Sequence, residues 1–326
     1  MRAAVFLEKE KIEIRDDYPK PVPGPNEVLI KVHLCGICGT DVKNYYHQLY
    51  QTPLVMGHEF SGQIVETGSE IKKFKIGENA TGINVMGKDY NDMRRIGIFK
   101  DGAFAEYVIV PEDYLFSFHD YVSSEEIAMI ESYAVAMRGI RWADIDPTKP
   151  TVIIGAGTIG LAMLDLLRAR FPNLPICIIE LQSFLQDKAL EFGANFAVSP
   201  QKGKIRKFFN QYGEVPIIFD CAGTQDTLKL STEIVGQSGN IVMVGIPRGE
   251  VILSGLILSL KEVGLRGCIS HNREDIMQTI KLMLDKKLHP ERLITDYVSL
   301  EQLQENLQRY KSTGPREFIK IMVKLH

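Results

Sequence analysis

Residues 151–167, TVIIGAGTIGLAMLDLL, decide the fold class. A β-branched strand runs into the pattern G-x-G-x-x-G, and a helix-forming stretch follows at once. This context separates a dinucleotide-binding turn from an ordinary glycine-rich turn. In such a turn Gly155 permits the sharp bend, Gly157 lets the backbone approach a pyrophosphate, and Gly160 lets the helix pack closely on the strand. The stretch therefore predicts a dinucleotide-binding site.

The residues after the glycines indicate which dinucleotide is bound. The helix N-terminus, with Thr158 and Ile159 in its first turn, offers N–H groups and partial positive charge to the phosphates. A second strand, ICIIE, ends in Glu180, 20 residues after Gly160. An acidic side chain at this place accepts both ribose hydroxyls and repels a 2′-phosphate. The sequence therefore predicts NAD rather than NADP, and no Lys or Arg follows Glu180 directly.

The segments around this turn alternate between apolar strands and helices. PTVIIGAG, ICIIE, PIIFDCAG and NIVMVGI are the expected strands, and TIGLAMLDLLRARF, FLQDKALEFGA and DTLKLSTEIVG are the expected helices. Such alternation is typical of a parallel sheet with right-handed crossovers. We therefore predict an α/β fold with a doubly wound parallel sheet in this part of the chain.

From residue 1 to about 130 the chain has a different pattern. Short segments such as EVLIKVHL and AEYVIVP alternate apolar and polar residues between Gly and Pro, and no helix longer than two turns is predicted. The period changes near Ser123, where SSEEIAMIESYAVAMRGIRWADI begins with a capping serine and continues with helical spacing. A mostly β domain is therefore expected before a helix that leads into the second domain.

The composition is that of a globular protein with two domains: 326 residues, 45% hydrophobic and 24% charged. The net charge of −3 provides no strong basic field for nucleic acid or an anionic membrane. The sequence shows no signal peptide and no long apolar run, so a cytoplasmic protein is expected. Five cysteines are an odd number, and Cys177 and Cys221 lie in apolar strands, so no disulfide framework is expected.

Residues 33–41, HLCGICGTD, place Cys35 and Cys38 in C-x-x-C spacing. A redox pair would need a small redox fold around it, and a structural zinc knot would need a second pair of ligands, which the sequence lacks. A third interpretation uses one cysteine with His58 and Glu59 of GHEF, because thiolate, imidazole and carboxylate are a normal ligand set for catalytic zinc. Taken alone, the His-Glu pair is better explained by hydrogen bonding within the fold.

Six motifs carry a family resemblance: GICGTD, GHEFSG, DGAFAEYVIVP, AMIESYAVA, GAGTIGL and MVGIP. Their order and spacing resemble the zinc-dependent medium-chain dehydrogenases of the alcohol dehydrogenase superfamily, most closely the polyol and sorbitol dehydrogenase branch. The resemblance covers essentially the whole chain. It implies a GroES-like, mostly β catalytic domain at residues 1–135, to which 271–326 return, and a Rossmann NAD-binding domain at 136–270.

The resemblance also implies one catalytic zinc ion. Cys38 and His58 are its implied ligands, and either Glu59 or Glu131 is the third protein ligand, with the other acting directly or through a water molecule. Cys35 is not a ligand by this comparison, so the C-x-x-C spacing is a coincidence.

Further roles follow from the same resemblance. Asp41 is expected to accept the other ring N–H of His58, and the Thr40 hydroxyl to pass the alcohol proton toward solvent. The implied contacts of the nicotinamide side are Val244, Gly245, Ile246, Cys268, Ile269 and Ser270.

The chain departs from the family at several places. The lobe GINVMGKDYNDMRRIGIFKDG is short and has no cysteine, so no structural zinc is expected. Lys43 stands where relatives often have a relay histidine, and Leu185 where they often have a cation. Ser270 and His271 replace the Arg-Tyr pair that binds substrate hydroxyls in sorbitol enzymes, so sorbitol itself is not predicted as the substrate.

The resulting hypothesis is a zinc-dependent oxidoreductase that transfers a hydride from a secondary alcohol to NAD. The expected substrate is a small polyol, sugar alcohol or sugar acid, and the expected assembly is a homodimer or homotetramer. One alternative is a zinc-free quinone or enoyl reductase of the same superfamily. Another is a catalytically silent NAD-binding protein, because fold alone does not establish activity.

Overall fold

The computed structural model describes residues 1–84, 92–247, 249–312 and 314–325. Part of the lobe for which no structural zinc is predicted, residues 85–91, lies outside these ranges. Within them, no helix combines the length and the apolar character that a membrane span requires. The chain forms two compact units: unit 1 is Met1–Glu131, Pro290–Gly314 and Lys320–His326, and unit 2 is Ser132–His289 and Pro315–Ile319.

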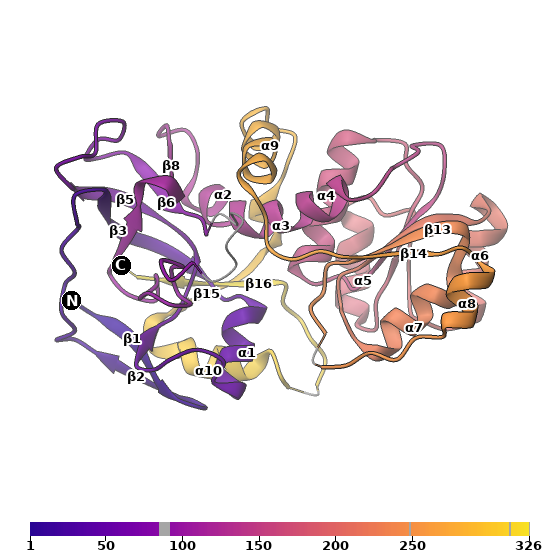
Figure 1. Cartoon of the computed structure of the whole chain (residues 1–326), viewed down its shortest axis with the longest axis horizontal. Coiled ribbons are helices and arrows are strands. Elements are labelled where there is room, and N and C mark those ends of the chain that lie inside the picture. Colours follow the sequence, from indigo (N-terminus) through magenta and orange to yellow (C-terminus); the bar gives the residue numbers. More distant parts are fainter. Residues whose placement is uncertain (85–91, 248, 313, 326) are drawn as a thin grey trace. The chain divides into compact units, whose positions relative to one another are not determined.

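Unit 1 is built mainly from antiparallel strands (Figure 1). One sheet has the order β2-β1-β4, and the larger sheet has the order β15-β16-β3-β5-β6-β8 with β7 also paired to β3. Its elements are β1 (Ala3–Glu8), β2 (Lys11–Arg15), β3 (Glu27–Gly36), α1 (Gly39–His47), β4 (Leu54–Val55), β5 (Glu59–Thr67), β6 (Asn79–Gly82), β7 (Tyr107–Pro111), η1 (Glu112–Tyr114), β8 (Leu115–Phe118), α2 (Ser124–Ala128), η2 (Pro290–Leu293), β15 (Ile294–Ser299), η3 (Leu300–Gln302), α10 (Leu303–Arg309) and β16 (Lys320–Lys324).

Strand β3 brings distant parts of unit 1 together. It pairs antiparallel with β5, β7 and β16. Its last residue, Gly36, lies opposite Glu59 of β5 and Met322 of β16. Three segments far apart in the sequence therefore meet where β3 ends and α1 begins.

Helix α1 was not predicted, because no helix longer than two turns was expected in the first 130 residues. It has nine residues, and its sequence GTDVKNYYH has only a weak apolar stripe. Capping stabilises it instead: Cys38 is the N-cap, and its sulfur accepts a hydrogen bond from the Thr40 N–H. The Asp41 carboxylate accepts from the Cys38 N–H at 2.9 Å, which completes a capping box.

Unit 2 contains a parallel sheet with the order β11-β10-β9-β12-β13-β14 among the described residues. This order, which reverses between β9 and β12, is that of the Rossmann fold and confirms the predicted fold class. Its elements are α3 (Ile130–Arg141, whose first two residues belong to unit 1), β9 (Thr151–Ile154), α4 (Thr158–Arg170), β10 (Ile176–Ile179), α5 (Ser183–Glu191), β11 (Phe196–Val198), α6 (Lys202–Tyr212), β12 (Val215–Asp220), α7 (Gln225–Ile234), β13 (Val235–Met243), α8 (Gly255–Leu260), β14 (Gly264–Gly267) and α9 (Arg273–Leu284).

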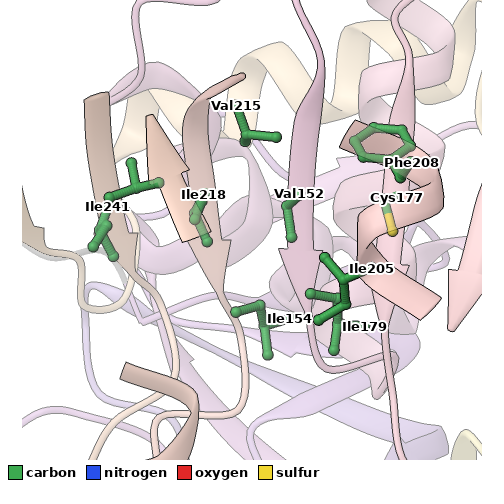
Figure 2. Packing of buried hydrophobic residues seen from close by; sticks show 10 residues of the cluster. Val152, Ile154, Cys177, Ile179, Ile205, Phe208, Val215, Ile218 and Ile241 are labelled. Carbon is green, nitrogen blue, oxygen red and sulfur yellow. The ribbon is translucent and has the colours of Figure 1, made fainter. Parts of the chain in front are cut away.

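The strands of unit 2 are apolar because helices cover both faces of a doubly wound sheet. Figure 2 shows one of its apolar clusters, in which side chains from the central strands pack against α6. The buried members are Val152, Ile154, Cys177, Ile179, Ile205, Phe208, Val215, Ile218, Val235 and Ile241. Burial of each such side chain contributes about 1.5–3 kcal/mol.

The return of the chain to unit 1 differs from the predicted boundary at residue 271. Helix α9 belongs to unit 2, because the buried carboxylate of Asp275 pairs with the guanidinium groups of Arg138 and Arg141 on α3, at 3.2 and 2.5 Å. Pro315–Ile319 also belong to unit 2, although the residues on both sides belong to unit 1.

Candidate metal and dinucleotide sites

The candidate metal site of unit 1 lies where β3, α1 and β5 meet. Sγ of Cys38, a ring nitrogen of His58 and a carboxylate oxygen of Glu59 lie within 4.8 Å of one another. The His58 and Glu59 side chains are buried, and Cys38 is half-buried. Among the residues that the structure describes, this is the group of His, Cys and acidic side chains with metal-binding geometry.

The space for this cluster depends on Gly36. A Cβ atom at this position would lie 3.0 Å from Oε2 of Glu59 and 3.2 Å from Cε of Lys320. Both distances are shorter than ordinary van der Waals contact. The glycine therefore allows β3 to pass close to the carboxylate.

The electrostatics of the cluster favour a bound cation. Burial raises the pKa of the Cys38 thiol, and the charge of Glu59 raises it further. Burial lowers the pKa of His58, but the negative charges of Asp41, Cys38 and Glu131 and the hydrogen bond to Cys38 together outweigh burial and raise this pKa well above its ordinary value. Thiolate, imidazole and carboxylate match the ligands of catalytic zinc, and a divalent cation would neutralise the crowded anionic groups. The donor set therefore fits zinc.

Glu131 lies outside the cluster but close to it. Its negative charge contributes to the raised pKa of His58. Glu131 is half-buried at the start of α3 and belongs to unit 1. Of the two candidate glutamates, the structure therefore places Glu59 with the cysteine and histidine, and Glu131 at a greater distance.

Lys320 is a site residue that the sequence analysis did not find. It is fully buried in β16, its Nζ is hydrogen-bonded to Oε2 of Glu59, and it donates to the Ile37 carbonyl at 3.1 Å. Burial lowers the pKa of Lys320, but the charges of Glu59, Tyr310 and Cys38, together with the hydrogen bond to Glu59, outweigh burial and raise it. Lys320 therefore stays charged and neutralises Glu59. No local pattern links the two residues, because the pair forms only when β16 joins β3.

The other residues predicted for the metal site have these positions. Nδ1 of His58 and Oδ1 of Asp41 are 3.6 Å apart, an ion-pair separation rather than a hydrogen bond. Thr40 is half-buried in the first turn of α1. Cys35 is a free, buried thiol outside the cluster, and a Cβ atom at Gly57 would lie 2.7 Å from its sulfur.

The glycine turn of unit 2 has the geometry that its sequence requires. Gly155 has a φ of 94°, which an L side chain rarely adopts. A Cβ atom at Gly160 would lie 1.9 Å from the Gly155 carbonyl oxygen, whereas nothing lies within 4 Å of a Cβ atom at Gly157. Helix α4 begins at Thr158 with no side chain capping it, so its first N–H groups are available to an anion.

Glu180 is fixed directly after β10. Its Oε2 accepts a hydrogen bond from the N–H of Ala156 in the glycine turn at 2.8 Å. Its Oε1 accepts from the N–H groups of Leu181 and Gln182 at 2.7 and 2.9 Å. A carboxylate has about four acceptor positions, so three backbone bonds hold it in place and leave acceptor capacity for a ribose hydroxyl.

The remaining predicted cofactor contacts follow strands of the same sheet. Val244, Gly245 and Ile246 follow β13, and Cys268, Ile269 and Ser270 follow β14. Because all these strands are parallel, their carboxyl ends share one edge with the glycine turn and Glu180, and ligands of such sheets bind at that edge.

Asp220, at the end of β12, stabilises this edge of the sheet through hydrogen bonds. It was not identified in the sequence analysis. Its backbone carbonyl accepts hydrogen bonds from the N–H groups of Val244 and Gly245, both at 2.8 Å. Its buried carboxylate accepts from the N–H of Gly223 at 2.9 Å and from the hydroxyl of Thr227. The signal was available, since Asp220 is the one acidic residue in the apolar strand PIIFDCAG.

The structure also shows the burial or backbone conformation of the residues at which the chain departs from the family. Lys43 is half-buried on α1, and Leu185 and His271 are buried within unit 2. Ser270 has a φ of 54°, in the left-handed region that non-glycine residues rarely adopt.

Comparison with known proteins agrees with this architecture. The profile of the "Alcohol dehydrogenase GroES-like domain" family matches residues 24–120, and that of the "Zinc-binding dehydrogenase" family matches residues 158–285. The chain belongs to the zinc-binding alcohol dehydrogenase family. The predicted GroES-like and Rossmann domains are thereby confirmed, and so is the resemblance to the polyol dehydrogenase branch.

Similar proteins place this dehydrogenase among the oxidoreductases. A sorbitol dehydrogenase of Halalkalibacterium halodurans is 27% identical over 94% of this chain and 93% of the relative. A D-xylulose reductase of Saccharomyces cerevisiae is 26% identical over 98% of this chain and 97% of the relative. The crystal structure of 2R,3R-butanediol dehydrogenase from Bacillus subtilis superposes with a TM-score of 0.88 at 25% identity, covering 99% of both chains. This dehydrogenase is an enzyme of the alcohol oxidoreductase class, and zinc and a nicotinamide dinucleotide are the cofactors of its family.

Proposed function

We propose that this chain is an NAD-dependent dehydrogenase with a single zinc ion, which oxidises a secondary alcohol of a polyol, sugar alcohol or sugar acid. The buried cluster of Cys38, His58 and Glu59 carries this proposal. The names of the similar proteins support the polyol class, because they include sorbitol dehydrogenase, D-xylulose reductase and butanediol dehydrogenase.

Cys38, His58 and Glu59 would hold the metal, and Glu131 would act through a water molecule. The compact arrangement of the first three side chains, with Glu131 outside it, supports this division. When bound, zinc supplies a Lewis acid that lowers the pKa of a hydroxyl group, from about 15.7 to about 7 in the case of water. Asp41 faces Nδ1 of His58 and would orient the ring, and Lys320 holds Glu59 in place.

The Thr40 hydroxyl would accept the proton of the alcohol and pass it toward solvent. Its position beside Cys38 and its partial exposure support this role. Bound NAD would supply the hydride acceptor for the carbon that carries the hydroxyl, so the products of a secondary alcohol would be a ketone and NADH.

NAD would be bound at the carboxyl edge of the unit 2 sheet. Gly155, Gly157 and Gly160, with Thr158 and Ile159, would receive the diphosphate. Glu180 would accept a hydroxyl of the adenosine ribose, and its negative charge disfavours the 2′-phosphate of NADP. The nicotinamide side would contact Val244, Gly245, Ile246, Cys268, Ile269 and Ser270.

We also propose a homodimer or homotetramer in the cytoplasm. None of the six residues of α8 is buried, and Leu256 and Leu260 are each 68% exposed. Exposed apolar side chains of this kind are typical of protein–protein interfaces. The five free cysteines fit a reducing compartment.

The test is NADH formation from NAD with a panel of polyols, sugar acids and simple secondary alcohols, before and after chelation and after zinc is restored. We expect turnover that disappears on chelation and returns with zinc. Turnover that persists without metal would favour a zinc-free reductase. NAD binding without any turnover would favour a catalytically silent protein.

Two cysteine variants provide a matched control for the metal site. Cys38→Ala should lower the zinc content from about one per chain to near zero and reduce turnover by at least about 100-fold, because even loss of an outer-shell partner reduces activity 10–100-fold. Cys35→Ala removes a buried thiol outside the cluster and should retain the zinc. Metal content measured by mass spectrometry distinguishes the two, and equal zinc loss in both would contradict the assignment.

A further inference from the structure

Residues 315–319, PREFI, form a short segment that belongs to unit 2. The residues on both sides belong to unit 1, yet these five belong to unit 2. Hydrogen bonds at both ends fix the segment beside the dinucleotide site. The N–H of Arg316 donates to Oε1 of Gln182 at 3.3 Å, and the carbonyl of Ile319 accepts from the hydroxyl of Thr158 at 3.1 Å.

These two contacts lie at functionally distinct places. Thr158 is the first residue of α4, where the helix has no side-chain cap. Gln182 directly precedes α5, and its N–H binds the carboxylate of Glu180. The segment therefore connects the phosphate end of the predicted site with its ribose end.

The guanidinium of Arg316 is held at the phosphate end. Its Nη2 donates to the carbonyl of Ile319 at 3.1 Å, and this is the same oxygen that the Thr158 hydroxyl binds. Its Nε donates to the carbonyl of Phe318 at 3.1 Å, and its Cζ lies 4.5 Å from the centre of the Phe318 ring. Three contacts thus fix the orientation of the guanidinium next to the first turn of α4.

The guanidinium of Arg316 places a positive charge beside the N-terminus of α4. The N-terminus of a helix carries a partial positive charge, so cations are stabilised at the opposite end. A diphosphate would remove the conflict, because it would be attracted by the helix N-terminus and by the guanidinium together. Local arrangements that conflict with such preferences are often found at functional sites.

We propose that the guanidinium of Arg316 binds the diphosphate of the dinucleotide together with the N-terminus of α4. The inference rests on the proposed dinucleotide site and adds a residue from outside the glycine motif to it. Arg316 is a binding residue in this assignment and takes no part in the hydride transfer. Its charge acts equally on NAD and NADP, because both carry the same diphosphate.

Calorimetric titration with NAD, NADP, ADP and adenosine tests the assignment. Arg316→Gln should weaken the binding of NAD and the binding of ADP by a similar factor, about 10- to 100-fold. A hydrogen bond to a charged group contributes about 1.5–3 kcal/mol, which corresponds to this range. Adenosine has no phosphate, and its affinity should stay within about twofold. The loss of affinity for NADP should equal the loss of affinity for NAD.

Three results would overturn the assignment. A much larger loss for NADP than for NAD would place Arg316 at the 2′-phosphate. Unchanged affinity for all four ligands would show that Arg316 only anchors the segment. Equal weakening of adenosine and ADP would indicate a general distortion of the site.

Two further variants separate charge from anchoring. Arg316→Lys keeps the positive charge and loses the forked contacts with the two carbonyls, so it should retain more ADP affinity than Arg316→Gln and a steeper dependence on salt. A lysine variant as weak as the glutamine variant would contradict a role of the charge. Lys229→Gln removes an exposed cation from α7 and should leave ADP binding unchanged.

The binding experiment is independent of turnover. A wild-type chain that binds ADP but oxidises no alcohol would overturn the proposed dehydrogenase activity and leave the role of Arg316 intact. If the wild-type chain oxidises alcohols and the Arg316→Gln variant binds ADP normally, the dehydrogenase activity stands and the role of Arg316 is overturned. A wild-type chain that binds neither NAD nor ADP would overturn the dinucleotide site and the inference together.

Discussion

At the scale of single residues, the ion pair between Lys320 and Glu59 has the largest consequences. Both side chains are buried, and neither can reach water. A buried charge without a partner is strongly destabilising, whereas removal of both charges is often tolerated. The pair therefore places a cation beside the carboxylate of a proposed metal ligand in the protein interior.

Lys320→Met should reduce the free energy of unfolding of the metal-free protein by about 3–5 kcal/mol, because Glu59 then loses its cation. Added zinc should recover part of this loss, since the metal supplies positive charge at the same carboxylate. Urea unfolding with and without zinc measures both effects.

The double variant Lys320→Met with Glu59→Gln is the control for this experiment. It removes both charges and should be more stable than Lys320→Met alone. Equal stability of the single and double variants would show that the ion pair contributes nothing.

At the scale of secondary-structure elements, the β9-turn-α4 unit separates two functions of glycine. Gly160 is needed for packing, because a Cβ atom there would collide with the Gly155 carbonyl. Gly157 has open space around its Cα and a φ of −71°, so the fold does not require a glycine there. Its expected role is to leave room for the diphosphate.

Gly160→Ala should lower the stability of the protein by about 1–3 kcal/mol, as overpacking generally does. Gly157→Ala should leave the melting temperature nearly unchanged and weaken NADH binding by at least about tenfold, because the added methyl group occupies the space of the ligand. Thermal unfolding and NADH fluorescence distinguish the two variants. If Gly157→Ala binds NADH like the wild type, the diphosphate does not approach this turn.

Local patterns made most of the elements predictable, and long-range contacts account for what was missed. The G-x-G-x-x-G turn and the strand-helix alternation predict the parallel sheet, because both are local. Short motifs also indicate Cys38, His58 and Glu59 as candidate metal ligands. No short motif indicates Lys320 or Arg316, because each acts through partners more than a hundred residues away in the sequence. Helix α1 was missed because capping at Cys38 stabilises it more than its weak apolar stripe indicates.

At the scale of the whole molecule, the apolar surface of α8 predicts self-association. Leu256 and Leu260 are exposed on a helix without buried residues. Replacement of both by glutamate should convert the proposed dimer or tetramer into smaller species, because charged residues are disfavoured in the core of an interface. Light scattering after size-exclusion chromatography gives the mass.

Met277→Glu is the matched control for this surface. Met277 is 51% exposed on α9, outside α8, and its replacement should leave the mass unchanged. A wild-type chain that is monomeric at micromolar concentration would contradict the proposed assembly.

The pairing of β16 with β3 also determines when the candidate metal site is complete during synthesis. Lys320 leaves the ribosome 261 residues after Glu59, and the whole of α4 to α9 is made in between. Domains generally fold in the order in which they are synthesised, but here the first unit to begin is the last to be completed. Until β16 is made, β3 lacks one of its neighbours and Glu59 has no cation. The nascent N-terminal segment therefore has a carboxylate that cannot be buried at low cost, and the main part of unit 2, Ser132–His289, is free to fold before unit 1 closes.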